Sequence, residues 1–311
     1  MSVRELVMLG TGADVPTKRR NLHGLLIRWD DEGILVDPAE GTQRQMIFAD
    51  VTATSLTRVF ISQFAADHCL GLAGVCQRIS LDRVPHAIEV AFPAAGRVYY
   101  DRLRKASVYH AAARLEPVPL TASGTFADLA DRQLIAAPVH RGEREDSDVW
   151  GFRLQERDRR TMLPDALREA GVTGPTIKVL QREGQVEVEG RVVRLEDVSV
   201  HRPGQAIAYL PPCRPSDVAV ELARGAAVLV CRNVRLEAER TDAERRGEMT
   251  ALEAALIASD AGVGQLVLTG FLPHVDDPAA HRDEAAAHFD PVRVAEDGDR
   301  VPVPRPRKPR A

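Results

Sequence analysis

The second half of the chain constrains the fold most, because short apolar strands alternate there with helices. From residue 205 onward, the segments AIAYL, VLVC and QLVLTG have the length and apolar content of buried strands, and SDVAVELARGA and TALEAALIASDAG separate them with helical patterns. Alternation of this kind is typical of domains in which helices cover a sheet. The sequence therefore predicts an α/β layered fold.

The first half is dominated by short strands. Leu6–Leu9 is apolar and ends in a glycine loop, and Leu22–Arg28 and Gly33–Val36 flank a polar turn, which predicts a hairpin. A short buried strand is expected at Arg58–Ser62, whereas Asp67–Ser80 has the periodicity of a helix. Both halves are therefore rich in strands.

Two segments differ from this pattern in composition. Between residues 153 and 203 the charge rises and alternating stretches such as QVEVEGRVVRL replace the apolar runs, which predicts an inserted arm. Residues 299–311 are basic and rich in proline, which predicts an extended, disordered tail. Apart from these segments, we interpret residues 1–311 as one domain.

Charge and cysteine usage narrow the functional classes. The net charge of −4 argues against binding nucleic acid through bulk charge, although it leaves a local basic patch open. The four cysteines form no CxxC pair, so a zinc knuckle is not indicated. No apolar run is long enough to cross a bilayer, and the N-terminus lacks the layout of a secretion signal. We expect a cytoplasmic protein without a membrane partner.

The glycine loop after the first strand has two interpretations. Gly10 and Gly12 fit the start of a dinucleotide-binding fingerprint, but Val15 stands where its third glycine belongs, and Pro16 follows. A helix does not begin easily at that point, because the residue before a proline disfavours helical angles. A tight turn that needs small residues is therefore favoured.

Three segments together resemble one known family. They are LGTGADVPTKRRN (Leu9–Asn21), VDPAEGTQRQ (Val36–Gln45) and VFISQFAADHCLGLAG (Val59–Gly74). Each is similar to its counterpart in ribonuclease Z, the endonuclease that removes the 3′ trailer from precursor tRNA, and their order and spacing match as well. The resemblance continues through the later segments and covers nearly the whole chain.

This resemblance implies a fold, a partner and a metal. The fold is the αββα metallo-β-lactamase sandwich, with an arm that protrudes and grips tRNA. The partners are tRNA or a tRNA-like RNA, and a second subunit in a homodimer. A heteromer with an active homologue is our own alternative to the homodimer. The implied cofactor is a pair of zinc ions about 3.5–4 Å apart, which convert water to hydroxide and neutralise the phosphoryl oxygens.

The metal ligands implied by the family match this chain only in part. Its histidine-rich loop has the pattern His-x-His-x-Asp-His, and here that loop reads Gln63, Phe64, Ala65, Ala66, Asp67, His68. Asp67, at the position of the family's general base, and His68 match. The isolated histidine of the family is matched by His140.

Three further family positions hold different residues. Pro212 stands where the bridging aspartate is expected, Gly270 replaces the late histidine, and Glu248 lies at the position of the histidine that donates a proton. Cys213 and His274 lie close in sequence to the lost ligands and could replace them. Because losing even outer-shell partners typically costs about 10–100-fold in metal affinity or activity, we predict a degenerate zinc site and a chain that is not an enzyme. We expect no cofactor, or zinc if there is any.

The three residues that match metal-ligand positions of the family have both a functional and a structural interpretation. Asp67, His68 and His140 could form a weak metal site. Asp67 could instead cap the helix that begins there, His68 could bond to nearby backbone, and His140 could be a satisfied, partly buried side chain.

RNA contacts follow from the same resemblance. Lys18 and Arg20 lie in a stretch that is near the RNA path in the family, and Gly174, Pro175 and Lys178 lie in the arm. We predict a protein of the tRNA 3′-processing family that binds RNA or regulates an active homologue. The alternatives are an active zinc-dependent endoribonuclease that removes the 3′ trailer, and a scaffold protein without an RNA role.

Overall fold

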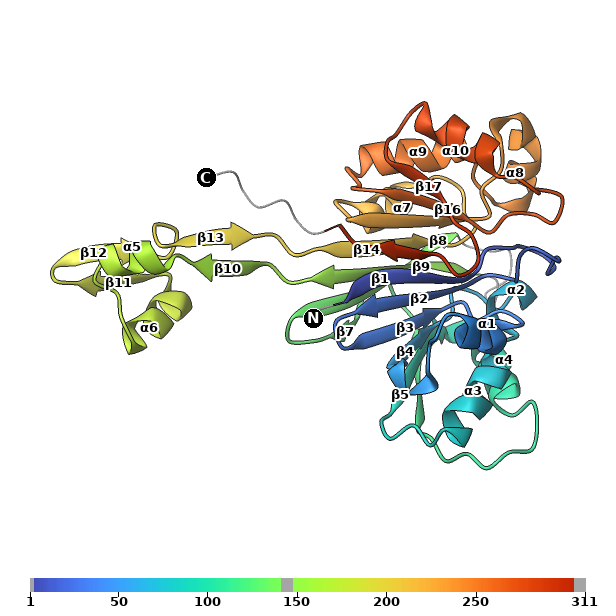
Figure 1. Ribbon diagram of the computed structural model, residues 1–311, viewed down its shortest axis with the longest axis horizontal. Coiled ribbons are helices and arrows are strands. Elements are labelled where there is room, and N and C mark those ends of the chain that lie inside the picture. The colour runs from blue at the N-terminus through green and yellow to red at the C-terminus, as the bar shows by residue number, and fades with distance from the viewer. Residues whose placement is uncertain (1–2, 141–147, 305–311) are drawn as a thin grey trace. The chain divides into compact units, whose positions relative to one another are not determined.

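The computed structural model describes residues 3–140 and 148–304 of the chain (Figure 1). The chain folds into two compact units. The larger unit holds the chain up to Asp128, the segment Gln133–Leu154 and the chain from Ala206 onward. The smaller unit holds Leu129–Arg132 and Gln155–Gln205.

Two mixed sheets form the larger unit. Their strand orders in the described part of the chain are β18-β1-β2-β3-β4-β5-β6 and β17-β16-β15-β14-β9-β8-β7. The strands of the first sheet are β18 (Arg300–Pro302), β1 (Arg4–Gly10), β2 (Gly24–Trp29), β3 (Glu32–Val36), β4 (Arg58–Phe60), β5 (Ile88–Pro93) and β6 (Leu115–Leu120). The strands of the second are β17 (Val292–Val294), β16 (Leu266–Thr269), β15 (Val228–Arg232), β14 (Ala206–Leu210), β9 (Val149–Glu156), β8 (Arg132–His140) and β7 (Gly124–Asp128).

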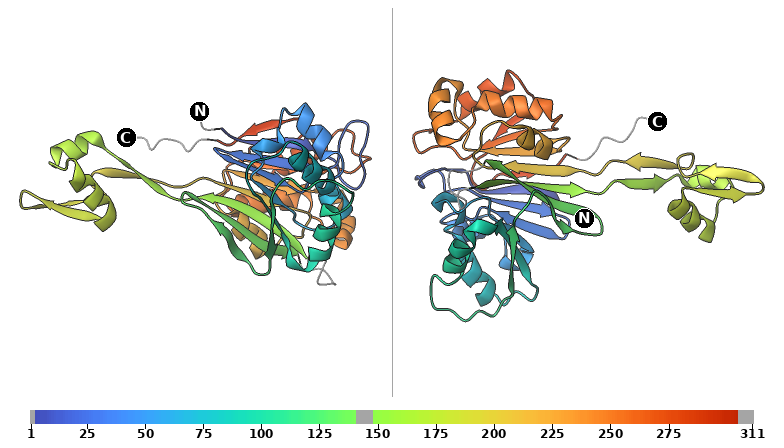
Figure 2. Two further views of the ribbon diagram at one scale, coloured as in Figure 1. Left: turned by 90° about the horizontal axis from the view of Figure 1, so that it is seen from below. Right: turned by 180° about the vertical axis from the view of Figure 1, so that it is seen from behind.

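Helices cover the outer face of each sheet, and the views in Figures 1 and 2 show the two groups on opposite sides. The helices beside the first sheet are α1 (Thr42–Phe48), α2 (Ala66–Cys69), α3 (Leu72–Leu81) and α4 (Arg97–Arg104). Those beside the second are α7 (Asp217–Ala223), α8 (Arg240–Arg246), α9 (Ala251–Asp260) and α10 (Ala279–Ala286). Short 3₁₀ turns are η1 (Ala53–Ser55), η2 (Ala94–Gly96) and η4 (Glu237–Glu239).

Three apolar layers hold this unit together. Trp29, Phe60 and Phe152 belong to a buried cluster between the sheets. A second cluster joins the first sheet to α1 and α3, and a third joins the second sheet to α7 and α9. These layers confirm the predicted αββα sandwich, because each sheet buries one face on the other sheet and one face on helices.

Two predicted elements differ from the structure. The helix predicted over Asp67–Ser80 is broken into α2 and α3 at Gly71, where an added Cβ would lie 1.9 Å from the backbone oxygen of Ala39. The tail predicted from residue 299 overlaps β18, whose residues pair with β1. Residues 305–311 of that predicted tail lie outside the described residues.

The smaller unit has its own apolar cluster, and its longer segment, Gln155–Gln205, overlaps the stretch predicted as an arm. Its elements are β10 (Arg159–Met162), α5 (Pro164–Glu169), α6 (Pro175–Glu183), β11 (Gln185–Val188), β12 (Arg191–Arg194) and β13 (Ser199–Arg202). Leu167 and Leu180 pack with Val193 and Val198 in its centre. No helix in the described part of the chain is long and apolar enough to span a membrane.

Candidate active site

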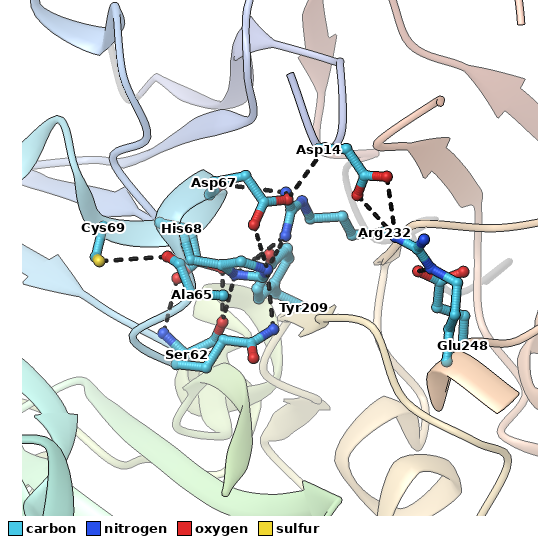
Figure 3. Close-up of polar contacts among 12 residues, drawn as sticks. Asp14, Ser62, Ala65, Asp67, His68, Cys69, Tyr209, Arg232 and Glu248 are labelled. Atoms are coloured by element: carbon cyan, nitrogen blue, oxygen red, sulfur yellow. Dashed lines mark hydrogen bonds and ion pairs between the residues drawn. The ribbon is translucent and has the colours of Figure 1, made fainter. Parts of the chain in front are cut away.

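A group of polar side chains gathers where strands of both sheets end (Figure 3). Asp37 follows β3, and His68 lies in α2 after the loop that leaves β4. Tyr209 lies near the end of β14, and Arg232 is the last residue of β15. The group therefore joins the first sheet to the second.

Asp37 is the acceptor at its centre. Its buried carboxylate accepts hydrogen bonds from the Ser62 backbone N–H at 2.7 Å, the Ser62 hydroxyl at 2.7 Å and the Tyr209 hydroxyl at 2.6 Å. Burial alone would raise the pKa of Asp37, but its interactions with His68, His23 and Arg232 together hold that pKa below its usual value. Burial and the charge of Asp37 raise the pKa of Tyr209, which keeps its hydroxyl proton in place.

His68 is held through both ring nitrogens. Nδ1 lies 2.8 Å from Asp37 Oδ2, and Nε2 lies 2.9 Å from the amide nitrogen of Gln63 and also against the guanidinium of Arg232. The carboxylate can only accept, and the amide and guanidinium N–H groups can only donate. These partners fit the tautomer that carries its proton on Nδ1, so the Nε2 lone pair is already an acceptor within the chain.

Arg232 is fully buried and lies between the two residues that match the family's histidine-rich loop. Its Nη2 donates to Asp67 Oδ2 at 2.5 Å and to the Asp67 backbone oxygen at 3.1 Å, while Nη1 donates to His68. Its Nε has no hydrogen-bond partner among the described residues. Burial would raise the pKa of Asp67, but the charge of Arg232 holds it far below its usual value.

This position of Arg232 was not predicted from the sequence. The available signal is an arginine that directly follows the apolar run VLVC of a buried strand. Such a residue is expected to have a buried partner, because a fully buried charge is costly without one.

The family positions that lack a ligand are arranged as follows. Gln63 contacts His68, and Ala65 precedes α2, where its backbone is the N-cap without a side-chain bond. Gly270 has a φ of +74°, and a Cβ built on it would lie 2.6 Å from Cγ of Arg232. The space beside Gly270 is therefore filled by the arginine side chain.

The two residues considered as replacement ligands are not placed for that role. Cys213 is fully buried, and burial raises the pKa of its thiol to about 12. His274 is largely exposed and faces Glu239, with 3.8 Å between Nε2 and Oε1. Among residues 3–140 and 148–304, no three His, Cys, Asp or Glu side chains gather in a way that could hold a metal ion.

His140 is half-buried at the end of β8, where its ring would lie 3.8 Å from a Cβ built on Gly247. It is not brought together with Asp67 and His68 as a ligand group. Asp67 does not cap its helix, since α2 has no side-chain cap bond. Its carboxylate bonds to Arg232 and, at 3.4 Å, accepts from the Asp14 backbone N–H.

Glu248 is buried in a network of ion pairs. One oxygen accepts from Arg235 at 2.5 Å and the other accepts from Arg246 at 3.2 Å. Arg246 also pairs with Asp14 at 2.9 Å, which links this network to the loop beside Asp67 (Figure 3). Because both oxygens of Glu248 accept from arginines, the arrangement is that of a structural carboxylate.

The residues predicted to contact RNA differ in exposure. Lys18 is exposed in the loop after β1, and Lys178 is exposed on α6. Gly174, with a φ of +53°, precedes Pro175 at the start of that helix. Arg20 is buried instead, because its guanidinium donates to Thr11 and the Ala295 backbone oxygen and lies over the ring of Phe271.

Solved structures place this architecture in a class. The short form of human tRNase Z is 21% identical, with a TM-score of 0.68 over 96% of this chain and 99% of that chain. A metallo-β-lactamase fold protein from Bacillus subtilis is 17% identical, with the same TM-score over 96% of this chain and 99% of that chain. The fold is therefore the metallo-β-lactamase fold. No protein-family model matches the chain.

Curated relatives identify the family to which the chain belongs within this fold class. Ribonuclease Z of Nocardia farcinica is 44% identical over 99% of this chain and 100% of that protein. Ribonuclease Z of Salinispora arenicola is 42% identical over the full length of both chains, and that of Chlamydia abortus is 38% identical over 98% of both. The chain belongs to the ribonuclease Z family.

These relatives contradict one prediction. We predicted from the replaced ligands that the chain is not an enzyme. Proteins that are 42–44% identical and match this chain over 98% or more of its length nevertheless bear the name Ribonuclease Z. Similarity over nearly the whole chain is a stronger indication of the protein class than the number of matching ligand positions.

The family implies zinc, and the described residues do not fit a zinc pair. The positions Gln63, Ala65, Pro212 and Gly270 offer neither imidazole nor carboxylate, the donors on which zinc sites of this kind depend. The lone pair of His68 and the carboxylate of Asp67 already bond to Arg232. We therefore assign no reaction step to a metal.

Proposed function

We propose that this chain acts on precursor tRNA as an endoribonuclease that removes the 3′ trailer. The observation that carries the proposal is identity of 42–44%, over 98% or more of the chain, to relatives named Ribonuclease Z. The sandwich fold agrees with it, because Tyr209 of β14 and Arg232 of β15 bond to residues that follow β3 and β4, which brings polar groups of both sheets together.

The RNA would be held by exposed cations near that edge and on the smaller unit. Lys18 lies in the same loop as Asp14, whose backbone N–H bonds to Asp67. Lys178 is exposed on α6, and its compact charge suits contact with phosphate. Arg20 is left out of the proposed RNA surface because its guanidinium is directed inward.

Cleavage of a labelled precursor tRNA with a 3′ trailer tests the activity. The full chain is incubated with this RNA in zinc, in manganese and in EDTA, and the product ends are mapped. We expect a product that ends at the start of the trailer, and its loss in the Asp67→Ala/His68→Ala variant. Absence of this product in all three conditions, or equal cleavage by the variant, would disprove the proposal.

Binding of the same RNA across a salt series tests the proposed contacts. The logarithm of the affinity should fall linearly with the logarithm of salt concentration, by about 0.7–0.9 per phosphate contact. Lys178→Ala should weaken binding and reduce that slope, whereas Glu187→Ala on β11 of the same unit serves as a control that removes no cation. An unchanged slope in Lys178→Ala would remove this residue from the RNA surface.

The family resemblance also implies a homodimer, and light scattering tests it. We expect a mass near twice the 34.1 kDa of one chain. The mass of a single chain would exclude this assembly without affecting the proposed substrate.

A further inference from the structure

The positive charge at the polar edge of the sandwich comes from the chain itself. A guanidinium is always charged near neutral pH and presents N–H donors in a fixed planar fork. Arg232 is completely buried, and this fork bonds to Asp67 and His68. These are the two residues that, by resemblance, would hold a metal ion.

A zinc ion and the guanidinium cannot share these partners. Arg232 Nη2 lies 2.5 Å from Asp67 Oδ2. A zinc ion bonded to that oxygen at about 2.1 Å would lie within about 5 Å of this nitrogen. Two cations so close in a buried site repel strongly. The Nε2 lone pair of His68, which a metal would need, also accepts from Arg232 and lies 2.9 Å from the amide of Gln63.

The neighbouring backbone is shaped to the same side chain. Gly270 stands at the position of the family's late histidine, and a Cβ there would lie 2.6 Å from Cγ of Arg232 and 2.6 Å from Oδ1 of Asn233. Contacts this short do not occur for real Cβ atoms, and the Asn233 backbone nitrogen would also lie 2.7 Å away, so a side chain at 270 requires both Arg232 and the Asn233 backbone to shift. The arginine therefore packs against a position whose φ of +74° and close backbone contact favour glycine.

We propose that Arg232 is the resident cation of this edge and replaces the zinc pair, so that the chain builds its candidate active site without a divalent metal. The replacement is complementary in charge, since the guanidinium neutralises Asp67. It is also complementary in shape, since Gly270 leaves room for it. This inference goes beyond the proposed function, and its readouts are bound metal and melting temperature rather than cleavage.

Zinc content and thermal melting of the full chain test the proposal directly. The purified protein is dialysed against zinc, then against metal-free buffer, and analysed for bound zinc. Its melting temperature is measured in zinc and in EDTA. We expect no retained zinc and the same melting temperature in both conditions. Two zinc ions retained per chain and lost in Asp67→Ala/His68→Ala, or a melting temperature that zinc raises, would overturn the proposal.

A set of variants tests whether removing Arg232 and restoring family histidines allows zinc to bind. The variant Arg232→Ala/Gly270→His/Gln63→His removes the internal cation and restores imidazoles at two family positions. We expect it to retain zinc and to melt at a higher temperature in zinc than in EDTA. The matched control Gly270→His/Gln63→His keeps Arg232, and we expect it to retain no zinc and to be less stable than the wild type.

The control variant shows whether zinc binding by the triple variant comes from removing Arg232 or only from adding the two histidines. Zinc bound by the control as tightly as by the triple variant would mean that Arg232 does not exclude the metal, and would overturn the proposal. Should the triple variant fail to fold, the measurements on the unmodified chain still decide, because they require no substitution.

Discussion

Two groups of ion pairs in the larger unit differ in their access to water. The first, the Arg232 group, consists of Arg232, Asp67, His68, Asp37 and Tyr209. In this group, the arginine side chain is 0% exposed and Asp67 is 14% exposed. In the Glu253 group on α9, the carboxylate is 8% exposed, but its partners Arg214 and Arg240 are 28% and 40% exposed. Water can therefore solvate the cations of the second group when their partner is removed, and it cannot reach the cation of the first.

This difference determines what each group contributes. Breaking a buried pair leaves a charge without water or partner, whereas a screened pair contributes little. The Arg232 group also connects both sheets, because Asp37 follows β3 while Tyr209 and Arg232 come from β14 and β15. The Glu253 group connects α9 to α8 and to the loop that follows β14, all within the second half of the chain.

The largest effect is expected for Arg232→Ala. Removing it leaves Asp67 without its buried counter-charge and opens space beside Gly270, so unfolding should become easier by about 3–5 kcal/mol. Urea denaturation followed by circular dichroism measures this change. The control Arg224→Ala removes an exposed pair with Glu221 and should change stability by less than about 1 kcal/mol. Equal effects of the two variants would refute the contrast.

The Arg232 group should stabilise the fold less in acid than at neutral pH. The folded pKa values of Asp67 and Asp37 lie below their usual values, so their stabilisation is complete above the unfolded pKa of about 4 and declines as pH falls toward the folded values. The free energy of unfolding should therefore fall between about pH 5 and about pH 3. In Asp67→Asn this slope should be shallower, and an unchanged slope would contradict the assignment.

An intermediate effect is expected for Arg214→Ala in the Glu253 group. Its guanidinium donates to both oxygens of Glu253, at 2.8 and 3.0 Å, and to the Glu248 backbone oxygen at 2.8 Å. Because Arg240 still pairs with Glu253, the loss should be only about 1–2 kcal/mol. The double variant Arg214→Ala/Arg240→Ala should lose more than the sum of the single changes, as measured in a denaturation cycle.

The smallest effect is expected in the smaller unit. Arg168 pairs with Asp165 on α5, and both side chains are largely exposed. Arg168→Ala should change stability by less than about 0.5 kcal/mol in urea denaturation. A larger loss would mean that exposure alone does not separate the groups.

Much of the fold could be predicted from the sequence because local patterns determine it. The strands predicted at Leu6–Leu9 and Arg58–Ser62 correspond to β1 and β4. The break at Gly71 could not be predicted, because it depends on contact with the backbone of Ala39, which is distant in sequence. The helical periodicity continues through that break.

The site was predictable only in its positions. Asp67 and His68 match the family motif in the sequence, but their contacts depend on Arg232, which is more than 160 residues later in the chain. Motif comparison records which ligands are absent and does not record what occupies their space. The inward direction of Arg20 was hidden for the same reason, since its partner Ala295 comes from the opposite end of the chain.

The close approach of Gly270 to Arg232 has a consequence for mutational paths. A histidine at 270 collides with the arginine, and a short side chain at 232 leaves the acidic partner unbalanced, so each single step toward the family's ligand set carries a cost. Substitutions at the two positions are therefore epistatic. Screens that change one residue at a time would find only losses there, while a library that varies both positions together removes the collision with the arginine and leaves the collision with the Asn233 backbone.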